Sequence, residues 1–207
     1  MEQFYANSPA TLVLLIVTTI ISLIAFLNPG LWRFLALEPY RMFHEKEFHG
    51  VVTSGFVHSG LGHLFINMYV LYMFGPTLES LLESPQFVIV YVVGLVVGSL
   101  YPLFKYRNRP EYVAIGASGA ISGVVFAFCL FIPFAPLGLI FLPGIHFPAI
   151  LFAILYVAYS VYAMKKAKDN IGHEAHLAGA LGGVVATIII QPLSVKVFIE
   201  QIQTLFT

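Results

Sequence analysis

Four polar side chains in this sequence could carry out chemistry, and all of them lie in long apolar segments. Ser118 lies in the run G-A-S-G at 116–119, and His176 lies in the run A-H-L-A-G at 175–179. His63 and Asn67 are four residues apart in a third segment. Polar and ionisable groups are costly within hydrocarbon, so their presence there indicates function. Because an imidazole can activate a serine hydroxyl as a nucleophile, these residue types predict a serine hydrolase built within a membrane.

The composition independently favours a membrane protein. Of the 207 residues, 59% are apolar and only 10% are charged, and the mean hydropathy is +0.89. These values are too apolar for a soluble domain, so we expect the lipid bilayer as a partner. The formal net charge is zero, which gives no argument for nucleic acid. Cys129 is the only cysteine, and this excludes an intrachain disulfide.

Charged residues divide the chain into uncharged windows, and a helix needs about 20 apolar residues to cross the hydrocarbon core. The uncharged stretch 112–164 is too long for one crossing, and its prolines divide it into two helices. We therefore expect an all-α, polytopic membrane protein with a single domain over residues 1–207. The six expected spans are residues 11–27, 57–78, 86–104, 117–132, 148–164 and 175–192. The long connection between the first two spans is expected to have structure of its own.

This arrangement places the polar residues at one depth. His63, Ser118 and His176 lie near the starts of spans two, four and six. In a bundle whose helices alternate in direction, the even-numbered spans begin at the same membrane face. The spacing of His63 and Asn67 places both on one side of their helix. All four residues are thus expected near one end of the bundle.

Small residues would allow the helices that bear Ser118 and His176 to pack closely. Eight of the twelve residues from 116 to 127 are Gly, Ala or Ser. Gly119 and Gly123, and likewise Gly179 and Gly183, have the spacing that favours tight helix pairs in lipid. Pairing these two faces would bring the hydroxyl and the imidazole within reach of each other.

Each feature also has a simpler interpretation. Glycine-rich helix pairs occur in transporters and channels, and an intramembrane serine often donates to its own helix. A histidine within a span can serve in a proton relay or bind a metal. His173 and His176 are three residues apart, whereas the helical zinc-protease motif needs histidines four apart, and position 177 is Leu. We therefore expect no metal and no cofactor.

Taken together, these residues resemble the rhomboid family of intramembrane serine proteases. The resemblance runs from about residue 49 to residue 191 and follows the family's order of motifs. It rests on H-x4-H-x3-N at 58–67, G-A-S-G at 116–119 and A-H-x2-G-x3-G at 175–183. Gly75 with Glu79 also resembles the family pattern, in which the acid is structural. The residues assigned to the structural motif are His58, Glu79, Gly116, Gly119, Gly179 and Gly183.

The resemblance implies that Ser118 is the nucleophile and His176 its general base, without a third acid. It implies an oxyanion hole formed by His63, Asn67 and the backbone N–H of Ser118. The expected substrates are transmembrane segments of membrane proteins. The alternative is a catalytically inactive rhomboid-like protein that binds transmembrane clients. A transporter or channel is a third class, but the expected spans hold no ionisable group at mid-membrane other than histidine.

Two positions depart from the family pattern. Many relatives have Trp-Arg where this chain has His49-Gly50, and Trp32-Arg33 lies too far upstream to substitute for it. We therefore expect the first loop to be held differently. The residue four positions after the nucleophile is often an aromatic that stacks on the base, but here it is Ser122. We expect either weaker orientation of the imidazole or an aromatic supplied by another helix.

The distribution of basic residues conflicts with the topology of related bacterial enzymes. Nine of the ten Lys and Arg residues fall in the first, third and fifth loops, which the positive-inside rule places in the cytoplasm. Related bacterial enzymes open the site on the opposite side. Following the resemblance, we expect a multi-pass protein of the bacterial inner membrane whose active site opens to the extracytoplasmic side.

Overall fold

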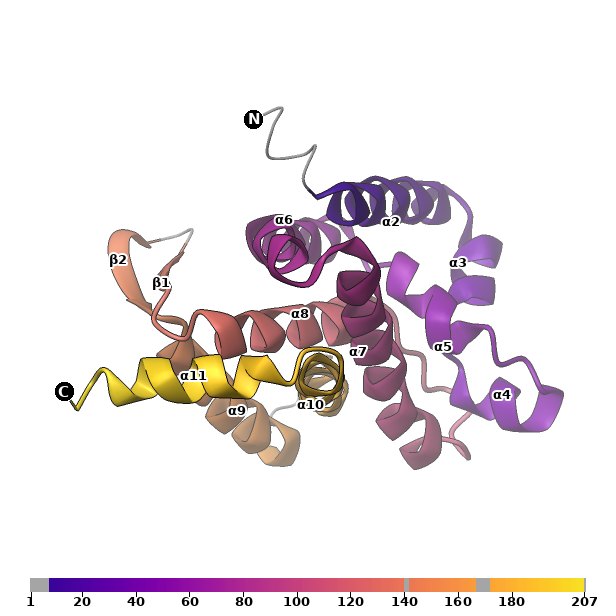
Figure 1. Cartoon of the computed structure of the whole chain (residues 1–207). Helices are drawn as coiled ribbons and strands as arrows, with labels where there is room; N and C mark the ends of the chain where they lie inside the picture. Colours follow the sequence, from indigo (N-terminus) through magenta and orange to yellow (C-terminus); the bar gives the residue numbers. More distant parts are fainter. Residues whose placement is uncertain (1–7, 140–141, 167–171, 207) are drawn as a thin grey trace.

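The computed structural model describes residues 8–139, 142–166 and 172–206, and its long helices form a bundle (Figure 1). The expected all-α, polytopic architecture is confirmed. Each expected span corresponds to one helix, and the bounds of these helices are α2 Pro9–Leu27, α6 Leu61–Leu82, α7 Ser84–Lys105, α8 Ser118–Phe131, α9 Ala149–Lys166 and α10 His173–Ile190. The largest shift is in the second span, where the helix begins at Leu61 rather than near residue 57 and continues to Leu82.

Within the described residues, α2, α7 and α10 are each long and apolar enough to cross a membrane, and α8 and Ala149–Met164 are shorter apolar helices. The 22-residue α6 contains His63, Asn67 and Pro76, which lower its hydropathy. The 14 residues of α8 rise about 21 Å, less than the roughly 30 Å of a hydrocarbon core. A helix this short cannot reach both surfaces, so α8 can begin at Ser118 below the membrane surface.

The connection between α2 and α6 has the structure that its length predicted. It forms α3 Pro29–Leu35, α4 Pro39–Glu45, α5 Gly50–Thr53 and the short 3-10 helix η1 Ser54–Phe56. Helices α3 to α5 lie together at one side of the bundle (Figure 1). Arg33 Nε donates to the buried carboxylate of Glu38 at 2.9 Å. Trp32 Nε1 donates to the carbonyl of His58 at 3.0 Å. Trp32 and Arg33 thus hold this loop from its beginning, in a chain that has His49-Gly50 where many relatives have Trp-Arg.

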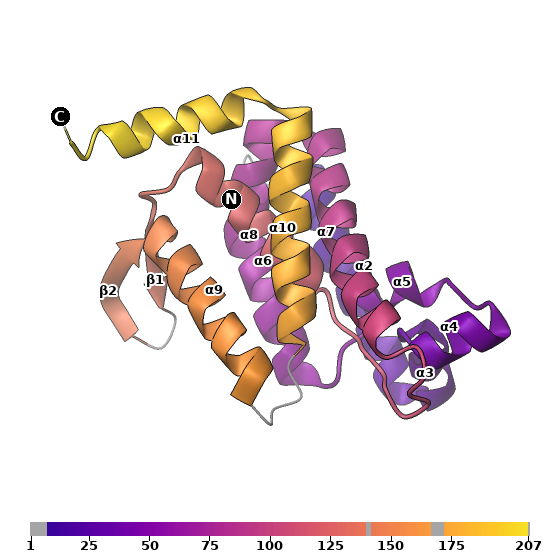
Figure 2. The ribbon, with the colours of Figure 1, turned by 90° about the horizontal axis from the view of Figure 1, so that it is seen from below.

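Two elements were not expected from the sequence. Strands β1 Pro136–Leu139 and β2 Leu142–Pro148 pair antiparallel, with Pro136 opposite Pro148. Helix α11, Leu193–Gln203, follows α10 after two residues and runs across its end (Figure 2). Both lie where prolines end the expected spans.

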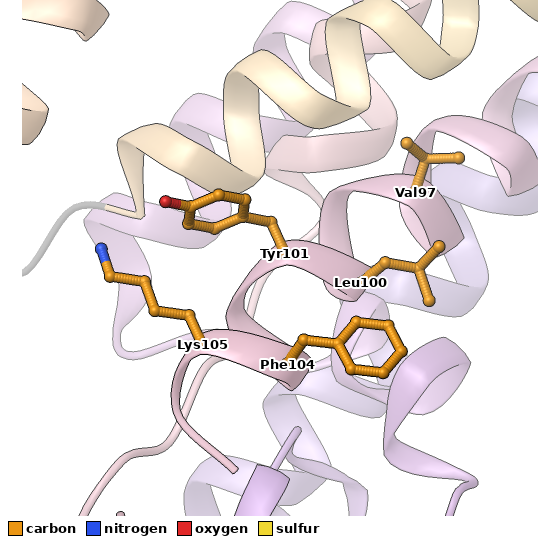
Figure 3. A pocket seen from close by; sticks show the side chains of 5 residues that line it. All are labelled: Val97, Leu100, Tyr101, Phe104 and Lys105. Carbon is orange, nitrogen blue, oxygen red and sulfur yellow. The ribbon is translucent and has the colours of Figure 1, made fainter.

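The buried core lies between α6, α7 and α8, where Leu71, Phe87, Tyr91 and Val124 are fully buried. The outward faces are apolar, as lipid requires, and Phe65, Leu181 and Ile189 are more than half exposed. Figure 3 shows the same outward character along the second half of α7, where a shallow depression is lined by Val97, Leu100, Tyr101, Phe104 and Lys105. At the end of this face the Lys105 ammonium pairs with Glu174 of α10. This ion pair thus lies where α7 ends and α10 begins.

Three helix backbones meet in the centre of the bundle. A Cβ on Gly179 of α10 would overlap the carbonyl group of Gly119 on α8, and a Cβ on Gly183 would overlap Gly123. On α7, a Cβ on Gly98 would lie 2.9 Å from the carbonyl oxygen of Ala175 and 3.3 Å from the Cα of Gly119. The expected close pairing of α8 and α10 is present in the structure. Gly98 was missed, although Gly94 and Gly98 have the same spacing of four residues on α7.

The carboxylate of Glu79, near the end of α6, holds the start of α2. It accepts hydrogen bonds from the backbone N–H groups of Ala10 and Thr11 at 2.9 and 2.7 Å. It also accepts from the hydroxyls of Thr11 and Ser84 at 2.7 and 2.6 Å. The first N–H groups of a helix have no partner within the helix, and a negative charge there is favourable. Glu79 is fully buried and its four donors come from two other helices, which explains a structural acid at this position.

We expect Glu79→Ala to lower the free energy of unfolding by about 3 kcal/mol or more, because the buried donors lose their acceptor. Glu79→Gln should cost less, since its amide keeps one acceptor oxygen. Thermal unfolding in detergent measures both effects. Glu200→Ala on α11 is the control, because that side chain is exposed. Equal stability of the Glu79 and Glu200 variants would show that the cap does not stabilise the bundle.

We expect Gly183→Ala to destabilise the protein by about 1–3 kcal/mol and to separate Ser118 from His176, because the added methyl overlaps backbone atoms that cannot move aside. Gly123→Ala should be milder, since the nearest atom to its added methyl is the Gly179 carbonyl oxygen at 3.1 Å. Gly62→Ala is the control, as its methyl meets nothing within 4 Å. Thermal unfolding of the three variants tests this order, and the reaction of Ser118 with a fluorophosphonate, which labels activated serines, tests the separation. A Gly183→Ala protein as stable as Gly62→Ala would contradict it.

Candidate active site

The side chains of Ser118 and His176 meet at the beginning of α8 and α10. His176 Nε2 lies 2.7 Å from Ser118 Oγ, which is a hydrogen-bonding distance. The two residues are 58 positions apart in sequence and are joined by the close packing of the two helices. The ring of His173, one turn earlier on α10, lies edge-on to the ring of His176 at a centroid distance of 6.2 Å. The imidazole that contacts Ser118 is thus that of His176.

Ser118 and His176 line a cavity of about 1070 Å³, and His63 and Asn67 line the same cavity. The four polar residues singled out in the sequence are therefore brought together. The walls also include Glu111 and Tyr112 of the α7–α8 connection, so the cavity extends toward a loop outside the spanning helices. This shape offers a route for water to the serine hydroxyl.

His63 presents a hydrogen-bond donor to the turn before Ser118. Its Nδ1 lies 3.5 Å from the backbone N of Ser59 and 3.1 Å from the Ser59 hydroxyl. Because a backbone N–H only donates, Nδ1 is the acceptor and the proton of the neutral ring lies on Nε2. A Cβ on Gly116 would lie 2.9 Å from this Nε2, and Gly116 has a φ of +109°, so only glycine fits there. The donor edge of His63 therefore lies against the turn that leads into Ser118.

Asn67 is buried, and its Nδ2 donates to the carbonyl of His63 at 2.9 Å. One N–H of this amide is thus used within α6, while the amide has a second N–H to offer. Ser118 is the first residue of α8, where backbone N–H groups lack a carbonyl partner within the helix. The start of α8 therefore supplies an N–H and the positive end of a helix dipole beside the serine hydroxyl.

A chain of hydrogen bonds through His58 connects the turn before Ser118 to α2. The N–H of Ala117 donates to His58 Nε2 at 3.4 Å, so the proton of the ring lies on Nδ1. Nδ1 donates to the hydroxyl of Ser22 at 2.9 Å, and this hydroxyl donates to the carbonyl of Phe56 at 2.8 Å. His58 is fully buried and lies in the connection before α6. Burial, aided by the nearby His63, lowers the pKa of His58 to about 3.

The backbone of the extended segment before α8 forms hydrogen bonds with the connection between α2 and α6. Leu37 and Ala114 exchange two backbone hydrogen bonds of 2.9 and 3.0 Å, and the N–H of Gly116 donates to Ser54 at 2.9 Å. Irregular backbone at membrane depth needs such partners within the protein. The first loop therefore positions the turn before Ser118.

An aromatic ring from another helix lies beside His176, one of the two outcomes left open by Ser122. Tyr156 of α9 has its ring centroid 6.4 Å from that of His176, with the planes inclined by 21°. Its hydroxyl lies 2.9 Å from the hydroxyl of Ser122. Sequence reasoning did not identify Tyr156, because the contact joins three helices and has no spacing signature along one of them.

No group of three or more His, Cys, Asp and Glu side chains among the described residues is arranged to hold a metal ion. The polar groups that the four candidate residues bring to the cavity are a hydroxyl, imidazoles and amide N–H groups. Such a set suits acyl transfer, in which a nucleophile attacks a carbonyl and donors stabilise the resulting oxyanion.

The buried His58 should make stability depend on pH. An exposed histidine has a pKa near 6.5, whereas the pKa of His58 in the folded protein is about 3. Between these values the unfolded chain binds a proton that the folded chain does not. The stability contributed by the neutral His58 should therefore be complete above about pH 6.5. Below that, the free energy of unfolding should fall as the pH decreases toward 3, by at most about 1.4 kcal/mol per pH unit.

We expect His58→Gln to flatten this slope between about pH 6.5 and 4, because the glutamine amide does not titrate but can accept from Ala117 and donate to Ser22. Denaturation in detergent at a series of pH values measures the slope. His44→Gln, on the exposed side of α4, is the matched control. Parallel slopes for the wild-type and His58→Gln proteins would contradict the neutral, buried state of His58.

Curated relatives share about a third of the aligned residues with this chain. Presenilin-associated rhomboid-like protein A, mitochondrial, from Danio rerio is 37% identical over 135 residues, which are 65% of this chain and 35% of the relative. RHOMBOID-like protein 12, mitochondrial, from Arabidopsis thaliana is 29% identical over 160 residues, 70% of this chain and 47% of the relative. Rhomboid protein 1, mitochondrial, from Saccharomyces cerevisiae is 29% identical over 164 residues, 76% of this chain and 46% of the relative. The chain thus spans less than half the length of each.

These relatives correct one expectation. Each is named as a mitochondrial protein, which points to a mitochondrial membrane. The expected placement in a bacterial inner membrane, with the site opening to the extracytoplasmic side, is therefore wrong. It rested on bacterial relatives alone, and the motifs that carry the resemblance do not depend on the compartment.

The family comparison agrees with the site. A family model described as Rhomboid domain matches residues 45–192, which include α6 to α10 and the four residues His63, Asn67, Ser118 and His176. The match covers far more than half of the chain. This chain belongs to the rhomboid family.

Proposed function

We propose that this protein is an intramembrane serine endopeptidase that cleaves transmembrane segments of membrane proteins with a Ser-His dyad. The observation that carries the proposal is the 2.7 Å contact between Ser118 Oγ and His176 Nε2 at a cavity that also holds His63 and Asn67. Membership of the rhomboid family supports the same class of activity.

The proposed reaction proceeds through an acyl-enzyme. Ser118 Oγ attacks the carbonyl carbon of the scissile peptide bond while His176 Nε2 takes the hydroxyl proton. The imidazolium then gives this proton to the leaving nitrogen, the C–N bond breaks, and the acyl group stays on Ser118. A water molecule, losing a proton to His176, attacks the ester carbonyl. The C–Oγ bond then breaks, the imidazolium returns the proton to Ser118 Oγ, and the new carboxyl end is released. These are the steps that a serine and an adjacent base perform in acyl transfer.

The oxyanion formed at each attack would be stabilised by three donors. They are the backbone N–H of Ser118 at the start of α8, the Nε2–H of His63 and an N–H of the Asn67 amide. Donors of this kind contribute mainly in the transition state, about 3–4 kcal/mol each in other acyl-transfer sites. The positive end of α8 acts in the same direction.

The substrate must expose a peptide bond at the depth of Ser118. A carbonyl within a regular helix is enclosed by its hydrogen bond and by neighbouring side chains, so the transmembrane segment must unwind locally. Residues that weaken helices near the cut, such as glycine or proline, should therefore favour cleavage. The cavity's extension to Glu111 and Tyr112 supports entry of the water that hydrolysis consumes.

The decisive experiment uses purified protein in detergent, a single-span substrate and a fluorophosphonate that labels activated serines. The wild-type protein should cleave the substrate and be labelled, and Ser118→Ala should lose both with unchanged unfolding temperature. His176→Ala should lose about 10⁴-fold or more in turnover, whereas His173→Ala should retain it. Cleavage by Ser118→Ala would refute the assignment. A wild-type protein that binds the substrate without cleavage or labelling would support the inactive-relative alternative.

A further inference from the structure

Tyr156 of α9 contacts both helices that carry the dyad. Its hydroxyl is 2.9 Å from that of Ser122 on α8, and its ring lies nearly parallel to the imidazole of His176 on α10 at a centroid distance of 6.4 Å. Ser122 is one helical turn after Ser118 and is buried. The Tyr156 side chain therefore spans from the nucleophile's helix to the base.

The imidazole of His176 needs such a support. In serine hydrolases with a triad, a carboxylate bonded to Nδ1 fixes the orientation of the histidine ring. Among the described residues, none of the hydrogen bonds or ion pairs joins a carboxylate to His176. Glu174, the acid nearest in sequence, is paired with Lys105. The ring must therefore be held by neighbouring groups, with Tyr156 alongside it and His173 at its edge.

The Tyr156 ring is itself held on several sides. Phe126 of α8 lies at a centroid distance of 5.6 Å with the planes inclined by 60°. Phe152, one turn earlier on α9, lies at 5.8 Å with an inclination of 34°. These distances are within the range of favourable aromatic pairs. With its hydroxyl bound to Ser122, the tyrosine has a defined position and can transmit it to the imidazole.

We propose that Tyr156 is a positioning residue for His176 and that the hydroxyl of Ser122 anchors it. The proposal rests on the function proposed above and extends it from α8 and α10 to a third helix. Helix α9 is inclined away from α10 along much of its length (Figure 2). On the face of α9 that points away from the bundle, the side chains of Ile154, Leu155 and Tyr162 are more than half exposed. The geometry of the dyad therefore depends on how α9 is seated through Tyr156.

The test compares Tyr156→Phe, Ser122→Ala, the double variant and Tyr156→Leu. Tyr156→Phe keeps the ring but removes the hydroxyl bond, so kcat should fall about 5-fold with little change in KM. Ser122→Ala should have the same effect, and the double variant should be no worse than either single one, because both remove one shared bond. Tyr156→Leu removes the aromatic ring, and kcat should fall about 10²-fold, as expected when a catalytic group is displaced. Tyr162→Phe, on the exposed face of α9, is the matched control.

The rate of labelling by the fluorophosphonate should fall in the same order of variants as kcat, while the affinity for the reagent stays unchanged. A general loss of packing would not produce this combination. Because Tyr156→Phe and Ser122→Ala change only one or two atoms, they keep the test valid if Tyr156→Leu fails to fold. Additive effects in the double variant, or unchanged kcat in both single variants, would overturn the proposal. Ser118-dependent labelling of the wild-type protein is measured first. If it is present and the Tyr156 variants behave as wild type, only this inference fails, whereas its absence refutes the proposed function itself.

Discussion

The contact of three helix backbones at Gly98, Gly119 and Gly179 determines the rest of the site. In lipid the hydrophobic effect does not drive helices together, so their association depends on close van der Waals packing and on polar contacts. Any side chain at Gly179 would overlap the Gly119 carbonyl and force α8 and α10 apart. Ser118 and His176 lie within one turn of this contact. Their 2.7 Å separation is therefore a consequence of backbone packing.

The short α8 creates a second requirement. Because the helix begins at Ser118, the segment that leads to it is irregular backbone within the bundle. The backbone polar groups of this segment form hydrogen bonds with Leu37, Ser54 and His58, all of which belong to the connection between α2 and α6. This explains why that connection folds into several short helices. Helix α2 is joined to the site through the Ser22 hydroxyl, which binds His58.

The periodic features of the fold could be predicted from the sequence. The apolar windows gave each long helix to within a few residues, and the spacing of small residues predicted that α8 and α10 pack closely. The start of α6 was misplaced, because Val57 is apolar and buried but belongs to the connection rather than to the helix. Hydropathy records burial and cannot distinguish lipid from protein as the covering partner.

The missed features depend on contacts between distant segments. Tyr156 is one of several aromatic residues on α9, and only the folded bundle shows that it faces Ser122 and His176. Trp32 reaches His58 because the chain between them folds back through α4, α5 and η1. The β1–β2 hairpin lies in a proline-rich stretch whose residues do not alternate between apolar and polar. In each case the sequence supplied the residue type but not the partner.

The histidines around Ser118 do not share one protonation pattern, and the hydrogen-bond partners of His58 and His63 set opposite ones. A backbone N–H directed at His58 Nε2 places the proton on Nδ1, whereas a backbone N–H directed at His63 Nδ1 places it on Nε2. In the proposed reaction His176 must leave Nε2 free to accept from Ser118. If His58 were protonated, its Nε2–H would face the Ala117 N–H, so that two donors would point at each other. The positive charge would also lie beside His63, whose ring centroid is 4.9 Å away. The neutral state of His58 is therefore a structural requirement of the turn before Ser118, because the Ala117 N–H needs an acceptor on that ring.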